Sequence, residues 1–150
     1  GIANIPKYLQ AGLNVGLGTD GCSSNNTLNM FKEMAICSFV QKVNAMNPTV
    51  LPAEEILNMA TIGGAKVLRW DDEIGTLEVG KKADLILVDI DKPHFAPWNN
   101  PVSDLVYSAQ GSDVKTTIVN GKILMKDYEV LTLDVERIMA ETERIARNVL

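Results

Sequence analysis

The sequence predicts an α/β fold, with a strand and helices in the first half and mostly strands in the second. Three observations carry this prediction. An apolar run over Asn14–Leu17 leads through a small polar loop into a helical pattern that starts near Leu28. After residue 69 the character changes, and strand-like apolar runs flank the dipeptide Asn120-Gly121. A last segment, from Val135 onward, repeats apolar residues every three or four positions, as an amphipathic helix does.

The first elements follow from local signals. Pro6 suits the first turn of a short helix over Pro6–Ala11, which Gly12 closes, and a strand over Asn14–Gly18 comes next. From Thr27 we expect a helix of about five turns, which Asn47-Pro48 ends. The apolar positions of this helix are Leu28, Phe31, Ala35, Phe39, Val43 and Met46.

Two shorter helices are expected next. Pro52 opens the first, with two carboxylates in its first turn, where the helix dipole favours negative charge. Thr61 is expected to cap the second helix, over Ile62–Leu68. The pair Gly63-Gly64 would allow another segment to pack closely against this helix.

The second half is predicted to be mainly β. Asn120-Gly121 is a strong signal for a two-residue hairpin turn, because both residues tolerate a positive φ. Asp134 is expected to cap the terminal helix. The predicted strands are Ala83–Ile90, Thr116–Val119 and Lys122–Met125.

Composition limits the class of protein. The 150 residues are 46% hydrophobic and 22% charged, which is typical of a globular domain. A net charge of −5 without a basic patch argues against nucleic acid, and no apolar stretch is long enough to cross a membrane. Cys22 and Cys37 form no metal or disulfide pattern, so we expect a reducing, cytoplasmic location. Because the chain starts at Gly1 rather than Met, we expect it to be part of a longer protein.

Asp20 is the main candidate for chemistry. It follows the predicted strand over 14–18, and the carboxyl ends of strands in parallel α/β folds collect catalytic groups and metal ligands. The chain has a single histidine, His94, whereas a hydrolytic metal site needs several imidazoles or carboxylates. Asp20 is therefore either one corner of a metal site whose other ligands lie elsewhere, or part of an ordinary Thr-Asp-Gly turn.

Each residue that follows Asp20 has a structural and a functional interpretation. The residues Ser23–Asn26 suit a cap for the following helix, and Ser24 and Asn25 are weaker candidates for substrate contact. Cys22 is expected to be a small buried packing residue rather than a metal ligand. His94, in a proline-flanked loop, is expected at the surface or at an interface.

Several segments together resemble the amidohydrolase superfamily, and more narrowly its 5-methylthioadenosine/S-adenosylhomocysteine deaminases. The resemblance runs through the whole chain in the order typical of the family. The matching segments are Gly18–Asn26, Leu28–Met34, Ala60–Lys66, Ile74–Leu85, Asn100–Val102 and Ile118–Lys122.

The resemblance implies a (β/α)8 barrel, the fold of metal-dependent hydrolases, with a flanking β-sandwich. Residues 1–68 would hold the last strand and helices of the barrel, and residues 69–150 the C-terminal strands of the sandwich with a terminal helix. In this family a His-x-His pair, two later histidines and the aspartate of strand eight hold Zn²⁺ or Fe²⁺. Only the aspartate position exists here, as Asp20, which would be both metal ligand and catalytic base. We therefore expect no tightly bound metal and no activity in this chain alone.

The implied parent reaction is deamination of adenosine-type nucleosides to inosine-type products and ammonia. Two alternatives stay open: a guanine, cytosine or triazine type of aminohydrolase, and a non-catalytic β-sandwich module. The expected partners are the nucleoside, the remainder of the same polypeptide and, in a homo-oligomer, further copies. The helix positions Leu28, Phe31 and Phe39 and the strand Leu85–Ile90 are expected to be buried in such contacts.

Overall fold

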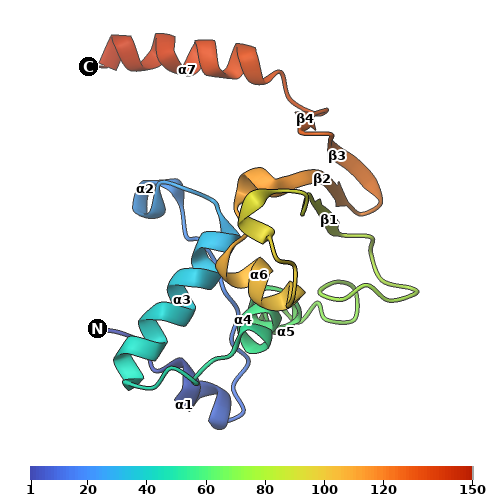
Figure 1. Cartoon of the computed structure of the whole chain (residues 1–150). Coiled ribbons are helices and arrows are strands. Elements are labelled where there is room, and N and C mark those ends of the chain that lie inside the picture. Colours follow the sequence, from blue (N-terminus) through green and yellow to red (C-terminus); the bar gives the residue numbers. More distant parts are fainter. Residues whose placement is uncertain (150) are drawn as a thin grey trace.

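Helices form the first part of the chain. The computed structural model describes residues 1–149, and the helices that precede the sheet lie at the end of the molecule opposite α7, except α2, which stands to one side at the level of the sheet (Figure 1). They are α1 (Ile5–Gln10), α2 (Cys22–Asn25), α3 (Met30–Ala45), α4 (Ala53–Ala60) and α5 (Ile62–Leu68).

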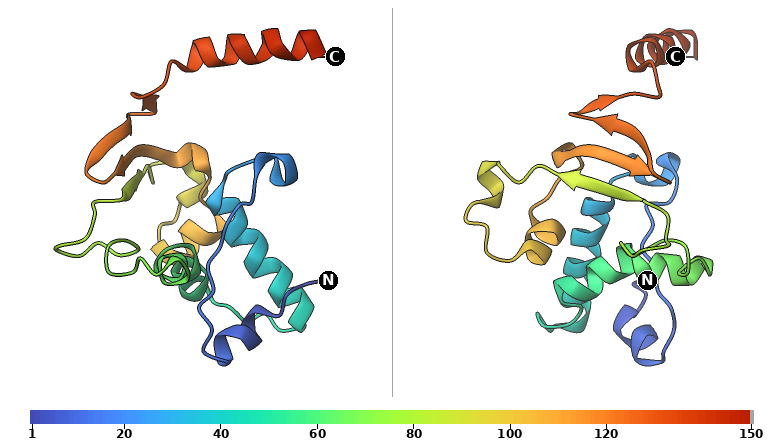
Figure 2. Two further views of the ribbon diagram at one scale, coloured as in Figure 1. Left: turned by 180° about the vertical axis from the view of Figure 1, so that it is seen from behind. Right: turned by 90° about the vertical axis from the view of Figure 1, so that its right-hand side faces the viewer.

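The second part is built around an antiparallel sheet of four strands in the order β1-β2-β3-β4 (Figure 2). The three predicted strands are confirmed, and each predicted bound lies within two residues of the observed one. The elements are β1 (Leu85–Val88), η1 (Pro93–Phe95), α6 (Pro101–Tyr107), η2 (Gly111–Asp113), β2 (Val114–Val119), β3 (Lys122–Lys126), β4 (Glu129–Val130) and α7 (Val135–Val149).

The strand expected over Asn14–Gly18 does not form within residues 1–149. A strand needs a hydrogen-bonded neighbour along its length, and the four strands present pair only with one another. This segment makes a single backbone bond to a helix, from the Leu17 N–H to the Met59 carbonyl oxygen at 3.0 Å. The partly buried side chains of Val15 and Leu17 nevertheless pack against the core.

Glycines let this segment lie very close to α5, as the sequence predicts. A Cβ atom on Gly63 would lie 2.6 Å from the carbonyl oxygen of Val15, and one on Gly16 would lie 2.8 Å from the Cα of Gly64. Both distances are shorter than a carbon atom tolerates, so the two backbones touch directly. The close approach fixes where the residues that follow Gly18 can stand.

The long helix α3 is confirmed, but its start differs from the expectation. Its cap is Asn29, whose Oδ1 accepts hydrogen bonds from the N–H groups of Phe31 and Lys32 at 3.1 and 3.3 Å. The expectation that Ser23–Asn26 cap this helix is therefore wrong. Most of those residues belong to α2, a short helix of their own.

The buried face of α3 also differs from the predicted one. Phe39, Val43 and Met46 are 54%, 71% and 88% exposed. The helix has apolar residues on two sides, so periodicity alone could not select the buried side. Two polar residues on the buried side of α3 form hydrogen bonds. Ser38 Oγ lies 3.0 Å from Tyr107 Oη, and Gln41 Nε2 donates to the Ala3 carbonyl oxygen at 2.7 Å. The buried residues are Phe31, Met34, Ser38 and Gln41.

One core joins the helical part to the start of the sheet region. The helix α6, which the sequence analysis did not predict, packs against α3 and α4. It begins at Pro101, and Asn100 Oδ1 caps it by accepting from the Ser103 N–H at 3.0 Å. The buried apolar residues are Phe31, Met34, Leu51, Ala53, Ile56, Met59, Phe95, Val106 and Ala109.

Turn and cap predictions have mixed outcomes. Asn120 and Gly121 join β2 to β3 with φ values of 49° and 74°, which confirms the hairpin. Asp134 caps α7, since its Oδ1 accepts from the Arg137 N–H at 3.0 Å. Thr61 does not cap α5 through its side chain, because its hydroxyl donates instead to the Leu57 carbonyl of the preceding helix at 2.7 Å.

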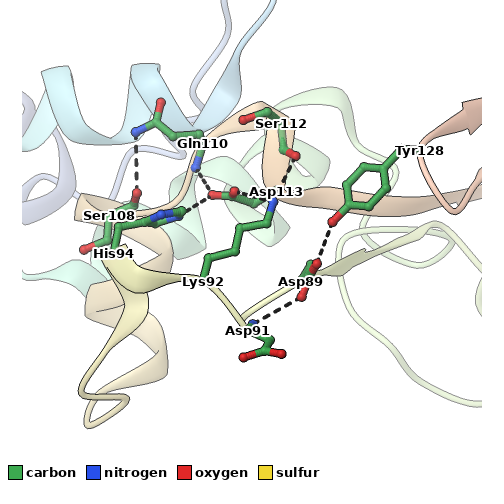
Figure 3. A network of polar contacts seen from close by, with 9 residues as sticks. All are labelled: Asp89, Asp91, Lys92, His94, Ser108, Gln110, Ser112, Asp113 and Tyr128. Atoms are coloured by element: carbon green, nitrogen blue, oxygen red, sulfur yellow. Dashed lines mark hydrogen bonds and ion pairs between the residues drawn. The ribbon is translucent and has the colours of Figure 1, made fainter.

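A buried carboxylate ties the loop after β1 to the segment before β2 (Figure 3). Asp113 is 1% exposed. Its Oδ1 accepts from Lys92 Nζ at 2.9 Å, and its Oδ2 accepts from the Gln110 N–H at 2.8 Å and lies 2.9 Å from His94 Nε2. His94 is partly exposed at the surface, but its ring is held by Asp113, a contact absent from the sequence analysis.

Burial by itself would raise the pKa of Asp113. The hydrogen bonds from Lys92, the Gln110 backbone and His94 together outweigh burial, and the pKa lies below its ordinary value. A carboxylate with a lowered pKa stabilises the fold above its ordinary pKa, and this contribution disappears as the pH falls through the lowered value.

We predict that Asp113→Asn lowers the free energy of unfolding at pH 7 by roughly 1–3 kcal/mol, because Lys92 loses its charged partner. The variant should also lose less stability than the wild type between pH 7 and pH 3. Urea titrations at several pH values check both effects. The control is Asp127→Asn, since Asp127 pairs with Lys115 at 3.5 Å on the surface. Equal behaviour of the two variants would contradict the assigned role of Asp113.

A second prediction concerns the glycines of α5. Gly63→Ala forces a Cβ into the Val15 carbonyl and should cost about 1–3 kcal/mol of unfolding free energy through overpacking. Gly64→Ala is the matched control, because the nearest atom to its new Cβ lies 3.8 Å away. We expect that control to be neutral or more stable by up to ~1 kcal/mol, since Ala favours helices. Equal losses in both variants would show that the close approach is unimportant.

Candidate functional site

Asp20 lies in the loop that connects segment 14–18 to α2, the short helix that stands to one side of the molecule at the level of the sheet (Figure 1). Its backbone has a φ of 58°, in the left-handed region. This conformation is uncommon for residues other than glycine, although aspartate tolerates it better than most. Such conformations concentrate at functional sites, where surrounding contacts hold them in place.

Only one of the two carboxylate oxygens of Asp20 accepts a hydrogen bond within residues 1–149. Its Oδ1 accepts from the Gly21 N–H at 2.7 Å, which is the contact expected of an ordinary turn. Among residues 1–149, Oδ2 has no hydrogen-bond partner, and the residue is exposed. One carboxylate oxygen therefore remains available to a ligand or to water, so the turn and the catalytic interpretations are compatible.

Asn25 holds the loop in place. Its Nδ2 donates to the Thr19 carbonyl oxygen and to Glu33 Oε1, both at 2.7 Å. These bonds tie the residue before Asp20 to the first turn of α3. Sequence analysis missed Glu33, because an acidic residue in the first turn of a helix is already explained by the helix dipole.

The other predicted residues of the loop lie in α2. Ser24 is exposed, and its hydroxyl donates to the Gly21 carbonyl oxygen at 3.0 Å, within the short helix itself. Cys22 is also exposed, so the expectation that it is a buried packing residue is wrong. The reason is that α2 contributes no buried residue and stands out from the end of α3.

Residues 1–149 contain no group of three or more histidine, cysteine, aspartate or glutamate side chains arranged to hold a metal ion. Structural and catalytic zinc sites use three or four protein ligands. These residues therefore do not make a complete metal site, and Asp20 can supply only one ligand. Two hollows of about 280 and 380 Å³ lie beside α1 and α4, and neither is lined by the Asp20 loop.

The structure thus connects Asn25, the last residue of α2, to the Asp20 loop through its bond to the carbonyl oxygen of Thr19, the residue directly before Asp20. It places His94 and Asp113 at the start of the sheet region, where they serve the fold (Figure 3). Within the described part of the chain, no helix has the length and apolar character that crossing a bilayer requires.

Comparison with known sequences identifies the family. Residues 1–124 match the model of the amidohydrolase family. The chain is 51% identical over 150 residues to a 5-methylthioadenosine/S-adenosylhomocysteine deaminase of Thermoanaerobacter pseudethanolicus, covering 100% of this chain and 35% of the relative. It is 53% identical over 146 residues to a 5'-deoxyadenosine deaminase of Methanosarcina barkeri, covering 97% of this chain and 33% of the relative. The chain therefore spans about a third of the length of these relatives.

Solved structures agree with the sequence comparison. An adenosine deaminase from Xanthomonas campestris with bound zinc has a TM-score of 0.95 and 34% identity, covering 99% of this chain and 34% of that chain. An atrazine chlorohydrolase from Arthrobacter aurescens in complex with zinc has a TM-score of 0.81 and 30% identity, covering 96% of this chain and 32% of that chain. The mixed α/β fold is therefore that of amidohydrolase structures, and with the family match over residues 1–124 the chain belongs to the amidohydrolase family.

Proposed function

We propose that this chain is the C-terminal part of a metal-dependent deaminase acting on adenosine-type nucleosides, such as 5-methylthioadenosine and S-adenosylhomocysteine. Water would replace the amino group on the purine ring, giving an inosine-type product and ammonia. The observation that carries the proposal is identity of about half to relatives named as deaminases of these nucleosides, over nearly the whole chain.

Under this proposal, residues 1–68 form the last strand and helices of a (β/α)8 barrel. Residues 69–150 form the C-terminal part of a β-sandwich with the terminal helix. Two features support it. Segment 14–18 packs against the core but has no strand beside it in residues 1–149. β1 is an edge strand, and its Ile86 and Leu87 are 46% and 53% exposed. Both would gain partners from the rest of a longer polypeptide.

Asp20 is proposed as the catalytic carboxylate and as one metal ligand. Zinc is the favoured metal, because the solved deaminase and chlorohydrolase both contain it, and Fe²⁺ stays an alternative. A metal of this kind lowers the pKa of bound water to about 7. The contribution of this chain would be a short, fixed side chain with one free oxygen, able to hold the ion and to accept a proton. The remaining ligands would come from outside residues 1–149.

Ser24 and Asn25 stay proposals as substrate contacts. Asn25 has a better-supported role, since its amide already connects Thr19 to Glu33. We propose Asn25 as a positioning residue that keeps the Asp20 carboxylate in place. Ser24 is exposed beside the loop and is the freer of the two for substrate.

Two other functions remain as alternatives. An aminohydrolase of the triazine type is supported by the chlorohydrolase structure, but at 30% identity compared with about 50% for the deaminases. A non-catalytic sandwich module should have a closed surface. The exposed apolar side chains of Val43, Met46, Leu77 and Val79 argue against it. The same exposed surface supports contact with the remainder of the polypeptide and a homo-oligomer, and the unpaired cysteines support a cytoplasmic location.

We predict that Asp20→Asn in the intact parent enzyme lowers the rate of ammonia release from 5-methylthioadenosine by about 10²–10⁴-fold. Asparagine keeps the shape and the left-handed backbone but cannot accept the proton. The unfolding temperature should stay close to that of the wild type, because the side chain is exposed. A variant that retains more than a tenth of the activity would show that Asp20 is only a turn residue.

We also predict that Asn25→Asp lowers activity in the parent enzyme without abolishing it. The new carboxylate would lose both hydrogen bonds and would repel Glu33, so the Asp20 loop would loosen. A second change, Glu33→Gln, removes the repulsion and offers a donor, and it should restore part of the turnover number. The kcat and KM of the single and double variants test this. If Glu33→Gln gives no rescue, the bond between these two side chains does not position the loop.

A further inference from the structure

The terminal helix α7 (Val135–Val149) has an apolar side that no residue of the described chain covers. Every residue from 131 to 148 is exposed. Figures 1 and 2 show α7 apart from the other elements in all three views. The exposed apolar side chains of this helix fall on one side of it, because a helix turns 100° per residue; they are Val135, Ile138, Met139 and Ile145.

The polar groups of α7, in contrast, satisfy one another. Asp134 caps the first turn through the Arg137 N–H. Arg144 pairs with Glu141 at 2.8 Å, and Arg147 pairs with Glu143 at 3.4 Å, both along the helix. The charged side of the helix is therefore compatible with exposure to solvent, whereas the apolar side packs against no other residue of the described chain. A helix of 15 residues is only marginally stable alone, so a covering surface is needed.

The position of α7 is shared with a protein of known structure. The 15 residues of α7 are a tenth of the 150-residue chain, and a TM-score of 0.95 over 99% of the chain requires most of them to superpose on that structure. The adenosine deaminase from Xanthomonas campestris therefore has an equivalent helix in a similar position. That chain is about three times as long, since the match covers 34% of it. Because residues 131–148 are exposed here, contacts that hold the helix would come from outside residues 1–149.

We propose that the apolar side of α7 docks onto the part of the same parent polypeptide that precedes Gly1. The exposed Leu131 and Leu133 extend this apolar surface back toward β4. The proposal rests on the chain being part of a longer enzyme, but not on the reaction that the enzyme catalyses.

A second copy of the chain is a poorer occupant. A helix of this length is about 22 Å long, and one side of it offers roughly 200 Å², whereas a stable dimer buries about 800 Å² on each partner. A segment of the same polypeptide needs no such area. The covalent connection holds it near α7 at an effective concentration of about 1 mM or more.

The test uses the full-length parent protein with a photo-cross-linking amino acid in place of Ile138. Equal amounts of isotopically light and heavy protein are mixed, irradiated and digested, and the cross-linked peptides are identified by mass spectrometry. We expect a peptide from upstream of Gly1, with light joined only to light and heavy only to heavy. The same group at Glu143, on the charged side, is the control and should give little cross-linking.

Mixed light and heavy products would show that a second copy covers the helix, and that result would overturn the proposal. A yield at Ile138 no higher than at Glu143 would also overturn it. As a second readout, Ile138→Asp should lower the unfolding temperature of the parent protein by several degrees, while Glu143→Gln should not. If the parent protein gives the expected cross-link but has no deaminase activity, the result supports this inference and contradicts only the proposed function.

Discussion

The close backbone contact between segment 14–18 and α5 decides where Asp20 stands. This segment has no strand beside it in residues 1–149, so the usual ladder of hydrogen bonds does not hold it. It is held instead by one bond to Met59, by the packing of Val15 and Leu17, and by glycines that let it touch α5. Asp20 follows directly, in a left-handed conformation that only a fixed neighbourhood sustains.

The candidate site depends on two anchors of different kinds. Packing against α5 fixes the segment before Asp20, and the amide of Asn25 fixes the loop against Glu33 at the start of α3. Neither anchor uses the free oxygen of the carboxylate. Under the proposed function, the chain would present one positioned ligand, and the other ligands of the metal site would come from residues beyond those described, since the chain is a third as long as its relatives.

Features set by neighbouring residues could be predicted from the sequence. The Asn120-Gly121 turn and the Asp134 cap depend on residues close in the chain, and both are as expected. The buried side of α3 could not be predicted, because apolar residues occur on two sides and the choice depends on α4 and α6. The strand over 14–18 failed for a related reason, since its partners are distant or absent.

In the candidate site too, local features could be predicted and contacts between distant residues could not. Asp20 could be proposed from the sequence because its motif is local, but the link from its loop through Asn25 to Glu33 connects two different helices. The Asp113 cluster was missed because its partners Lys92 and His94 lie about twenty residues away and meet it only in the folded chain.

The central claim is that Asp20 belongs to a metal site completed by the rest of a longer polypeptide. The most direct measurement is a crystal structure of the zinc-loaded parent protein, with anomalous diffraction data collected on both sides of the zinc absorption edge. The account predicts one strong zinc peak about 2.0–2.2 Å from a carboxylate oxygen of Asp20, with the other ligands from residues upstream of Gly1. A fully occupied zinc site that lies away from Asp20 would contradict it.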